Sequence, residues 1–159
     1  VNILWSHEGE GLETAGGIIN ALPLLGDEPF ILVNGDVWTT MDFASLLDVQ
    51  LGEQQAHLVL VENPPQHLKG DFILSNGLAY TFEQEKLGEA LTYSGIAVLH
   101  PRMFVGLENG KRPLAPLLKQ AMQQQQVSAE KMQAVWVDVG TPERLQQLDQ
   151  QIKQGVFAQ

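Results

Sequence analysis

An α/β fold with a mixed or mainly parallel sheet is the architecture that this sequence predicts. Short apolar runs that are typical of buried strands alternate with amphipathic helical stretches over residues 1–60. The dipeptide Asn76-Gly77 lies between two further strand-like runs and indicates a hairpin inserted into this alternation. The chain has 159 residues, of which 44% are hydrophobic, so it can bury a substantial core, and we expect one domain.

The expected strands follow from period-two alternation or from continuous apolar runs. They lie at residues 1–6, 30–33, 57–61, 72–74, 79–82, 93–99 and 135–139. Residues 62–70 contain two prolines and a glycine with little periodicity, and we expect a loop there.

The expected helices follow from apolar residues that recur every three or four positions and from residues that favour helix ends. They begin after Thr14, after Asp42 and after Thr141, and two more are expected at residues 101–107 and 113–124. Pro23 and Gly26 should end the first helix.

Charge and composition exclude several classes of protein. Lys and Arg number 9 against 19 Asp and Glu, so the net charge of −10 argues against a nucleic-acid partner. The absence of Cys excludes a disulfide framework and thiolate metal sites. No apolar run approaches the roughly 20 residues that span a bilayer, and no secretory signal is visible. We therefore expect a cytoplasmic protein with no membrane partner, and the sequence makes no prediction of its oligomeric state.

The first candidate site lies where the apolar run at residues 30–33 stops at Asn34-Gly35-Asp36. Ligands of parallel α/β sheets bind beyond the carboxyl ends of strands. Gly35 lets the backbone turn sharply and lets a ligand approach closely. Because Mg²⁺ prefers one or two carboxylates together with phosphate oxygens and water, Asp36 is a candidate metal ligand. A turn residue or a helix cap is the alternative, since Asp is common at both.

The second candidate is Asp138, which lies within the apolar stretch Val135–Pro142. An acidic side chain there is costly to bury unless it has a cation, a hydrogen-bond network or an exit into a cleft. Two aspartates at strand ends could share one metal ion. An edge-strand Asp that points to solvent is the alternative.

The third candidate is the glycine-rich stretch at residues 8–17, between a strand-like run and a helix. Such loops present backbone N–H groups and a helix N-terminus to anions or to base edges. The pattern is neither the dinucleotide-binding fingerprint nor a P-loop, and structural glycines explain it equally well.

The ordered set of these features resembles the sugar-1-phosphate nucleotidyltransferases, which join a nucleoside triphosphate to a sugar 1-phosphate and release pyrophosphate. The stretch from Glu8 to Gly16 is similar to their nucleotide loop, and Asn34-Gly35-Asp36 to their metal-binding strand end. Tyr93–Ile96 resembles the sugar-side strand and Trp136–Pro142 the second metal-binding segment.

Within that family, the resemblance is to the branch that acts on N-acetylmuramate 1-phosphate in cell-wall sugar recycling. The supporting stretches are residues 12–18, 21–27, 33–39, 69–72 and 94–96. Glu13 stands where many relatives have Gly, which favours this branch but weakens any base contact inferred there.

The resemblance implies a three-layer, Rossmann-like nucleotidyltransferase core. The chain begins at Val1 rather than Met, and the family's signature loop would precede it. We therefore expect residues 1–159 to form one partial, N-terminally truncated nucleotidyltransferase domain. On its own, such a chain is expected to be inactive.

The resemblance also implies roles for individual residues and partners. Asp36 and Asp138 would be the catalytic residues and would hold Mg²⁺. Nucleotide contacts would come from Glu8, Gly11, Thr14, Ala15 and Gly16, and sugar contacts from Asn34, Gly70, Asp71, Ser94 and Gly95. The implied partners are a nucleoside triphosphate, with UTP expected, and a sugar 1-phosphate.

Two other functions stay open on the sequence. One is a non-catalytic module that binds a nucleotide or a sugar. The other is a metal-dependent glycosyltransferase with a similar core, although such enzymes usually hold the metal with Asp-x-Asp, and here Asp36 is followed by Val37-Trp38.

Overall fold

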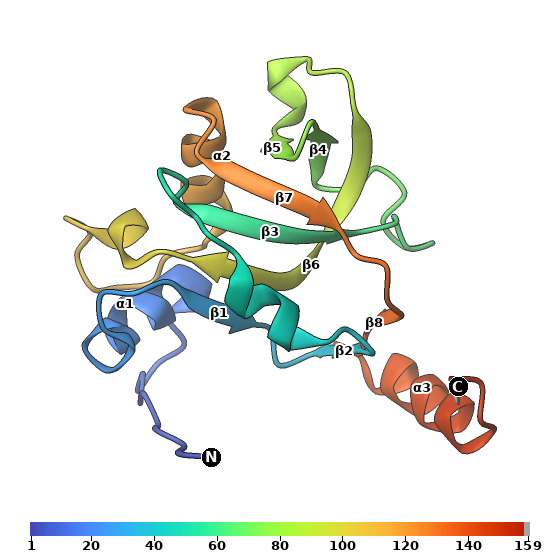
Figure 1. Ribbon diagram of the computed structural model, residues 1–159. Coiled ribbons are helices and arrows are strands. Elements are labelled where there is room, and N and C mark those ends of the chain that lie inside the picture. Colours follow the sequence, from blue (N-terminus) through green and yellow to red (C-terminus); the bar gives the residue numbers. More distant parts are fainter. Residues whose placement is uncertain (158–159) are drawn as a thin grey trace.

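The computed structural model describes residues 1–157 and centres on a six-stranded sheet (Figure 1). In spatial order the strands are β1 (Phe30–Val33), β6 (Glu89–Leu99), β3 (Ala56–Val61), β7 (Val127–Lys131), β5 (Leu78–Tyr80) and β4 (Phe72–Ser75). β4 also pairs with the first part of β6. A separate two-stranded ribbon joins β2 (Val37–Thr39) to β8 (Trp136–Asp138).

The sheet is mixed, which confirms the α/β class. β3 and β7 are parallel, whereas β6 runs antiparallel to both β1 and β3, between which it lies. β1, β3 and β7 therefore point in one direction. Fewer strand pairs are parallel than the alternation of strands and helices suggested. The reason is that β6, which follows the β4–β5 hairpin, lies between β1 and β3 and pairs antiparallel with both.

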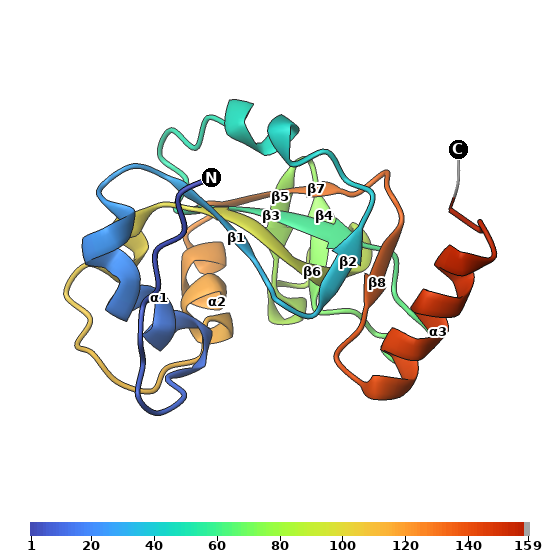
Figure 2. The same ribbon diagram turned by 90° about the horizontal axis from the view of Figure 1, so that it is seen from below.

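Helices cover one face of the sheet and a 3₁₀ segment covers the other, as Figure 2 shows. α1 (Glu13–Leu25) and α2 (Ala115–Gln123) pack against one face of the sheet, and their apolar side chains form a large cluster with those of the strands. η1 (Phe43–Asp48) packs with the opposite face in a smaller cluster. β3 alternates between the two, because successive side chains of a strand point to opposite faces. Its continuous apolar run is therefore buried on both sides, as predicted.

The remaining elements complete the fold. η2 (Phe82–Gln84) follows β5, η3 (Pro101–Phe104) follows β6, and α3 (Pro142–Lys153) follows β8. α3 lies beside the β2–β8 ribbon, away from the helices that cover the sheet (Figure 2). No helix in residues 1–157 is long and apolar enough to cross a membrane.

Several local predictions are confirmed. Asn76 and Gly77 have φ of 50° and 75°, the left-handed pair that a tight hairpin turn requires, and they join β4 to β5. The Thr141 side chain caps α3 by accepting a hydrogen bond from the Arg144 N–H at 3.3 Å. The Asp42 carboxylate accepts a hydrogen bond from the Ala44 N–H and caps the helix that was expected to begin after Asp42. That helix is the 3₁₀ helix η1.

The predicted strand at residues 1–6 is wrong. These residues form no strand, and Ile3, Leu4 and Trp5 are 69%, 70% and 78% exposed. Their alternating pattern suits a strand, but a strand also needs a neighbour for its backbone hydrogen bonds, and no other segment of residues 1–157 pairs with this one.

The limits of the first helix also differ from the prediction. Leu12, not Thr14, is the N-cap of α1, and Pro23 lies inside the helix, which continues to Leu25 before Gly26 ends it. Thr14 is not needed as a cap, because the carbonyl of Arg112 accepts the N–H groups of both residues that follow Thr14. β2 and β7 are the strands that the sequence did not predict. β2 has only three residues, and in β7 (Val127–Lys131) only Val127 and Ala129 are apolar, so the periodicity of β7 is weak.

Candidate functional site

Asp36 and Asp138 lie side by side on the β2–β8 ribbon. Asp36 directly precedes β2 and Asp138 ends β8, with Val37 opposite Asp138 in the antiparallel register. The N–H of Val139 donates to the carbonyl of Asp36 at 2.8 Å. Neighbouring rungs of one short ladder therefore fix the separation of the two aspartates.

Their carboxylates converge on one point above Gly140. A Cβ placed on Gly140 would lie 3.1 Å from Asp36 Oδ2, 3.0 Å from Asp138 Oδ1 and 3.2 Å from Arg144 Nη2. Asp138 Oδ1 already accepts hydrogen bonds from the Gly140 N–H at 2.8 Å and from Arg144 Nη2 at 3.1 Å. The missing side chain at Gly140 keeps the space between the two carboxylates open.

The donor set fits a hard cation that arrives with its substrate. Among residues 1–157 there is no cluster of three or more His, Cys, Asp or Glu that could hold a metal ion. Mg²⁺ does not need one, because it is usually bound by one or two carboxylates together with phosphate oxygens and several waters. The two aspartates can supply this pair of ligands to a phosphate-bound ion.

A small pocket of about 220 Å³ borders the aspartates and brings five of the predicted site residues together. They are Asn34, Asp36, Ser94, Gly95 and Asp138. Asn34 is held there by its N–H, which donates to the carbonyl of Gly95 at 2.8 Å. Gly95 has φ of 79°, and a Cβ on it would lie 2.8 Å from Asn34 Nδ2. Glycine at this position thus makes room for the Asn34 side chain.

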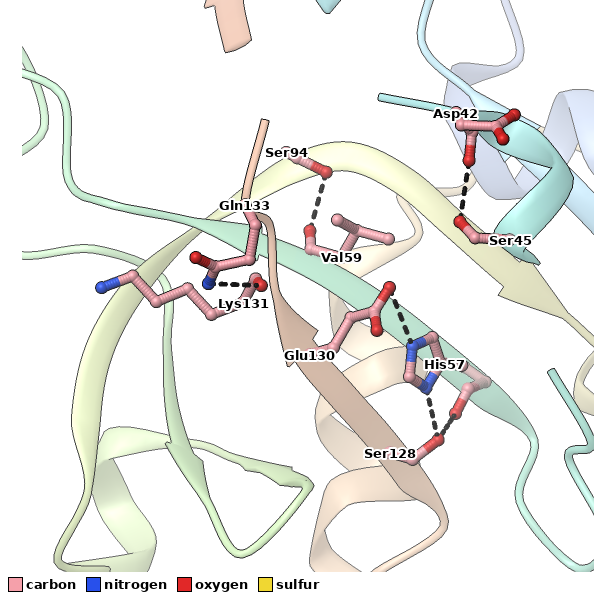
Figure 3. A network of polar contacts seen from close by, with 10 residues as sticks. Asp42, Ser45, His57, Val59, Ser94, Ser128, Glu130, Lys131 and Gln133 are labelled. Atoms are coloured by element: carbon pink, nitrogen blue, oxygen red, sulfur yellow. Dashed lines mark hydrogen bonds and ion pairs between the residues drawn. The ribbon is translucent and has the colours of Figure 1, made fainter. Parts of the chain in front are cut away.

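The Ser94 side chain is engaged with β3 and does not point into the pocket. Its hydroxyl is buried and donates to the carbonyl of Val59 at 2.7 Å (Figure 3). The same hydroxyl accepts from the Ile96 N–H at 3.1 Å. These bonds bridge the irregularity in pairing between β3 and β6 that follows Val59. The carbonyl of Ser94 accepts the indole N–H of Trp136 at 2.8 Å, which ties the ribbon to the sheet.

A second pocket, of about 440 Å³, adjoins the first and shares Asn34 and Tyr93 with it. Thr14 and Asp71 lie in its wall. The Asp71 carboxylate accepts from the Tyr93 N–H at 2.9 Å and lies 3.0 Å from His67 Nε2. The expected nucleotide residue Thr14 and the expected sugar residue Asp71 therefore face the same cavity.

Gly70, another expected sugar contact, is buried beside this pocket and does not line it. Its φ is 73°, and a Cβ there would lie 2.6 Å from Asn63 Oδ1 and 2.7 Å from the carbonyl of Leu91. Gly70 therefore allows the loop after β3 to pass close to β6.

The rest of the expected nucleotide loop is engaged within the protein. The Glu8 carboxylate accepts from the Leu12 N–H at 2.9 Å. Ala15 and Gly16 are buried and donate their N–H groups to the Arg112 carbonyl at 3.0 and 3.1 Å. Gly11 is exposed. Glu8 and Thr14 also line a groove of about 520 Å³ between α1 and β1.

Tyr93 and Arg144 are candidate residues that the sequence did not single out. The Tyr93 hydroxyl is buried without a hydrogen-bond partner among the described residues, and burial raises its pKa, so it stays a neutral donor. Arg144 lies in the first turn of α3, where the helix dipole disfavours a cation. That unfavourable position was the available signal for Arg144, whereas Tyr93 was marked only as part of the stretch that resembles the sugar-side strand.

The fold is similar to that of solved nucleotidyltransferases. The solved structure of UDP-glucose pyrophosphorylase complexed with UDP-glucose matches it with a TM-score of 0.67 and 15% identity, over 91% of this chain and 64% of that chain. No family model matches the sequence.

The sequence itself is similar to particular members of that class. It is 47% identical over 152 residues to N-acetylmuramate alpha-1-phosphate uridylyltransferase of Neisseria meningitidis serogroup B, which is 92% of this chain and 65% of the relative. The enzyme of the same name from Caulobacter vibrioides is 28% identical over 142 residues, which is 84% of this chain and 59% of the relative. These similarities confirm the resemblance to the sugar-1-phosphate nucleotidyltransferases. The chain spans less than two thirds of the length of these relatives.

Proposed function

We propose that the protein to which this chain belongs transfers UMP from UTP to N-acetylmuramate 1-phosphate and releases pyrophosphate, in cell-wall sugar recycling. The identity of 47% with the Neisseria enzyme of that name supports the choice of substrates. The observation that carries the proposal is the convergence of the Asp36 and Asp138 carboxylates above Gly140, at the edge of a pocket. Because UTP is an intracellular metabolite, the proposed reaction takes place in the cytoplasm.

The proposed reaction needs no nucleophile from the protein. An oxygen of the sugar phosphate attacks the α-phosphorus of UTP in line with the departing pyrophosphate, so one P–O bond forms as another breaks. Mg²⁺ held by Asp36 and Asp138 would neutralise the phosphate charge. The protein's part is to hold the two anionic substrates together in the correct orientation.

The pockets divide this task. We assign the reacting phosphates to the 220 Å³ pocket beside the two aspartates, with Asn34 and the Ser94–Gly95 backbone in its wall. We assign the nucleotide to the adjoining 440 Å³ pocket, which is bordered by Thr14. Tyr93 lines both pockets and forms part of the wall between them.

The test is pyrophosphate release by the protein expressed from its complete reading frame. Mg²⁺, each nucleoside triphosphate and a panel of sugar 1-phosphates are supplied. UTP with N-acetylmuramate 1-phosphate is expected to give the fastest turnover. Asp36→Asn is expected to lower it about 100-fold or more, because it removes one ligand of the ion that stabilises the transition state.

Asp27→Asn is the matched control, since Asp27 is an exposed acid between α1 and β1 and lines none of these pockets. Turnover of Asp36→Asn equal to that of Asp27→Asn would remove the metal assignment. No pyrophosphate with any pair would favour the binding module, and sugar transfer from a nucleotide sugar would favour the glycosyltransferase.

A further inference from the structure

A larger cavity, of about 640 Å³, opens on the other side of Asp138. The loop after β3, the segment between β7 and β8, and α3 form its walls. It shares Pro64, Gln66, Trp136 and Asp138 with the 220 Å³ pocket. A substituent on a sugar whose phosphate occupies the smaller pocket can therefore extend into this cavity.

Two cations line the cavity, and they differ in how fully they are paired. Lys131 Nζ lies 3.0 Å from Glu62 and 2.7 Å from Glu89, so two carboxylates already neutralise it. Arg144 contacts one carboxylate, that of Asp138, through Nη2 at 3.1 Å. Arg144 Nε is buried and has no hydrogen-bond partner among the described residues. Arg144 is therefore the cation with a donor left for a ligand.

A buried donor without a partner is unfavourable in the empty protein and becomes favourable when a ligand supplies an acceptor. The guanidinium group is planar and presents its N–H groups as a fork that matches a carboxylate. Because the chain has a net charge of −10, Arg144 is not part of a general basic surface. An incompletely paired arginine in a cavity therefore attracts an anion to that one place.

We propose that this cavity binds a carboxylate carried by the sugar substrate and that Arg144 is the residue that selects it. The proposal rests on the proposed function and names its substrate class as sugar 1-phosphates with an acidic substituent. N-acetylmuramate meets this description, because it is N-acetylglucosamine with a lactyl ether that ends in a carboxylate. The neutral sugar leaves Arg144 Nε unpaired, and sites with unpaired buried groups discriminate strongly against the analogue that lacks the partner.

The kinetic test compares kcat/KM for N-acetylmuramate 1-phosphate with kcat/KM for N-acetylglucosamine 1-phosphate, with UTP and Mg²⁺ held constant. Arg144→Gln is expected to lower the ratio of the two at least tenfold, and Arg144→Lys to restore part of it. Lys131→Gln is the matched control, since it removes the other cation of the same cavity, and it is expected to leave the ratio unchanged. A ratio that Arg144→Gln does not change, even if both rates fall together, overturns the proposal, because Arg144 would then act only through Asp138.

A binding measurement separates failure of this proposal from failure of the proposed function. Circular dichroism first shows which variants are folded. The dissociation constant of each sugar 1-phosphate is then measured by titration calorimetry for the wild-type protein, Arg144→Gln and Arg144→Lys. Tighter binding of the acidic sugar, weakened at least tenfold in Arg144→Gln, supports the proposal even if no pyrophosphate is released. If Arg144→Gln does not fold, weakened binding in Arg144→Lys is the supporting result. Equal binding of the two sugars by the wild-type protein overturns the proposal.

Discussion

The backbone N–H of Tyr93 donates a hydrogen bond of 2.9 Å to a carboxylate oxygen of Asp71, 22 positions earlier in the chain. The other oxygen of the same carboxylate lies 3.0 Å from His67 Nε2. One side chain thus joins the loop after β3, the start of β4 and the middle of β6. Tyr93 lies between the two candidate substrate pockets, so this carboxylate sets the position of their shared wall.

Asp71→Ala should therefore destabilise the fold. It leaves the Tyr93 N–H without an acceptor in a partly buried position, and an unsatisfied donor of this kind costs about 1–3 kcal/mol. Asp71→Asn keeps an acceptor oxygen and should cost less than about 1 kcal/mol. Urea unfolding of both variants checks the difference. Equal losses would mean that the charge on Asp71, not the hydrogen bond to Tyr93, provides the stability.

Gly95→Ala should be more harmful than the same change at Gly77. Both glycines have left-handed backbones, with φ of 79° and 75°. At Gly95 a new Cβ would also lie within 2.9 Å of Asn34 atoms, whereas at Gly77 it meets nothing within 4 Å. We expect losses of about 2–4 kcal/mol at Gly95 and about 1 kcal/mol at Gly77. If unfolding experiments give the same loss at both positions, the Asn34 side chain is not confined by Gly95.

Glu13→Gly should stabilise the protein, although it deletes a side chain from α1. Glu13 has φ of 60°, which costs a residue with a Cβ about 1–2 kcal/mol. Its contact with Lys111, at 3.7 Å and largely exposed, contributes little. After the entropy cost of glycine, the net gain in unfolding free energy is about 0.5–1 kcal/mol. Glu13→Ala retains the strain and should show no such gain in thermal or urea unfolding.

His57 should make stability depend on pH. The imidazole lies between Ser128 on one side and Glu130 on the other, at 2.9 and 3.8 Å (Figure 3). Burial lowers its pKa below 6.5, and Glu130 only partly offsets this effect. The folded state therefore binds fewer protons than the unfolded state just below pH 6.5. Stability is fully present above pH 6.5 and is lost as the pH falls toward the folded-state pKa.

The decrease cannot exceed about 1.4 kcal/mol per pH unit for one group. Urea unfolding between pH 5 and 7.5 should show this decrease in the wild-type protein and a smaller one in His57→Gln. Parallel curves for the two proteins would show that other groups, such as His100, whose pKa burial also lowers, cause the dependence.

Local signals were read correctly where they are complete within a few residues. The continuous apolar run of β3, the Asn76-Gly77 turn and the Thr141 cap each determine their structure with their immediate neighbours. The strand expected at residues 1–6 failed because alternation describes one strand, whereas a strand forms only against another. β7 was missed for the opposite reason, since pairing with β3 and β5 stabilises a segment whose own pattern is weak.

The candidate site shows the same division. The sequence placed Asp36 and Asp138 at strand ends, and the structure brings them together. It could not show that the Ser94 hydroxyl is engaged by Val59, 35 positions away, or that the Arg112 carbonyl takes the N–H groups of Ala15 and Gly16. These are long-range hydrogen bonds, which no local spacing encodes.

The two-stranded ribbon has a consequence for how this protein can change during evolution. Asp36 and Asp138 are spaced by one short ladder outside the six-stranded sheet. That ladder is joined to the sheet by the indole hydrogen bond of Trp136 and by the packing of Val37 and Trp136 against the smaller apolar cluster, on the face away from α1 and α2. Substitutions that loosen the packing between the sheet and the helices α1 and α2 therefore reduce the amount of folded protein without altering the spacing of the carboxylates. Sequence drift in the core and conservation of the chemistry are governed by different parts of the chain.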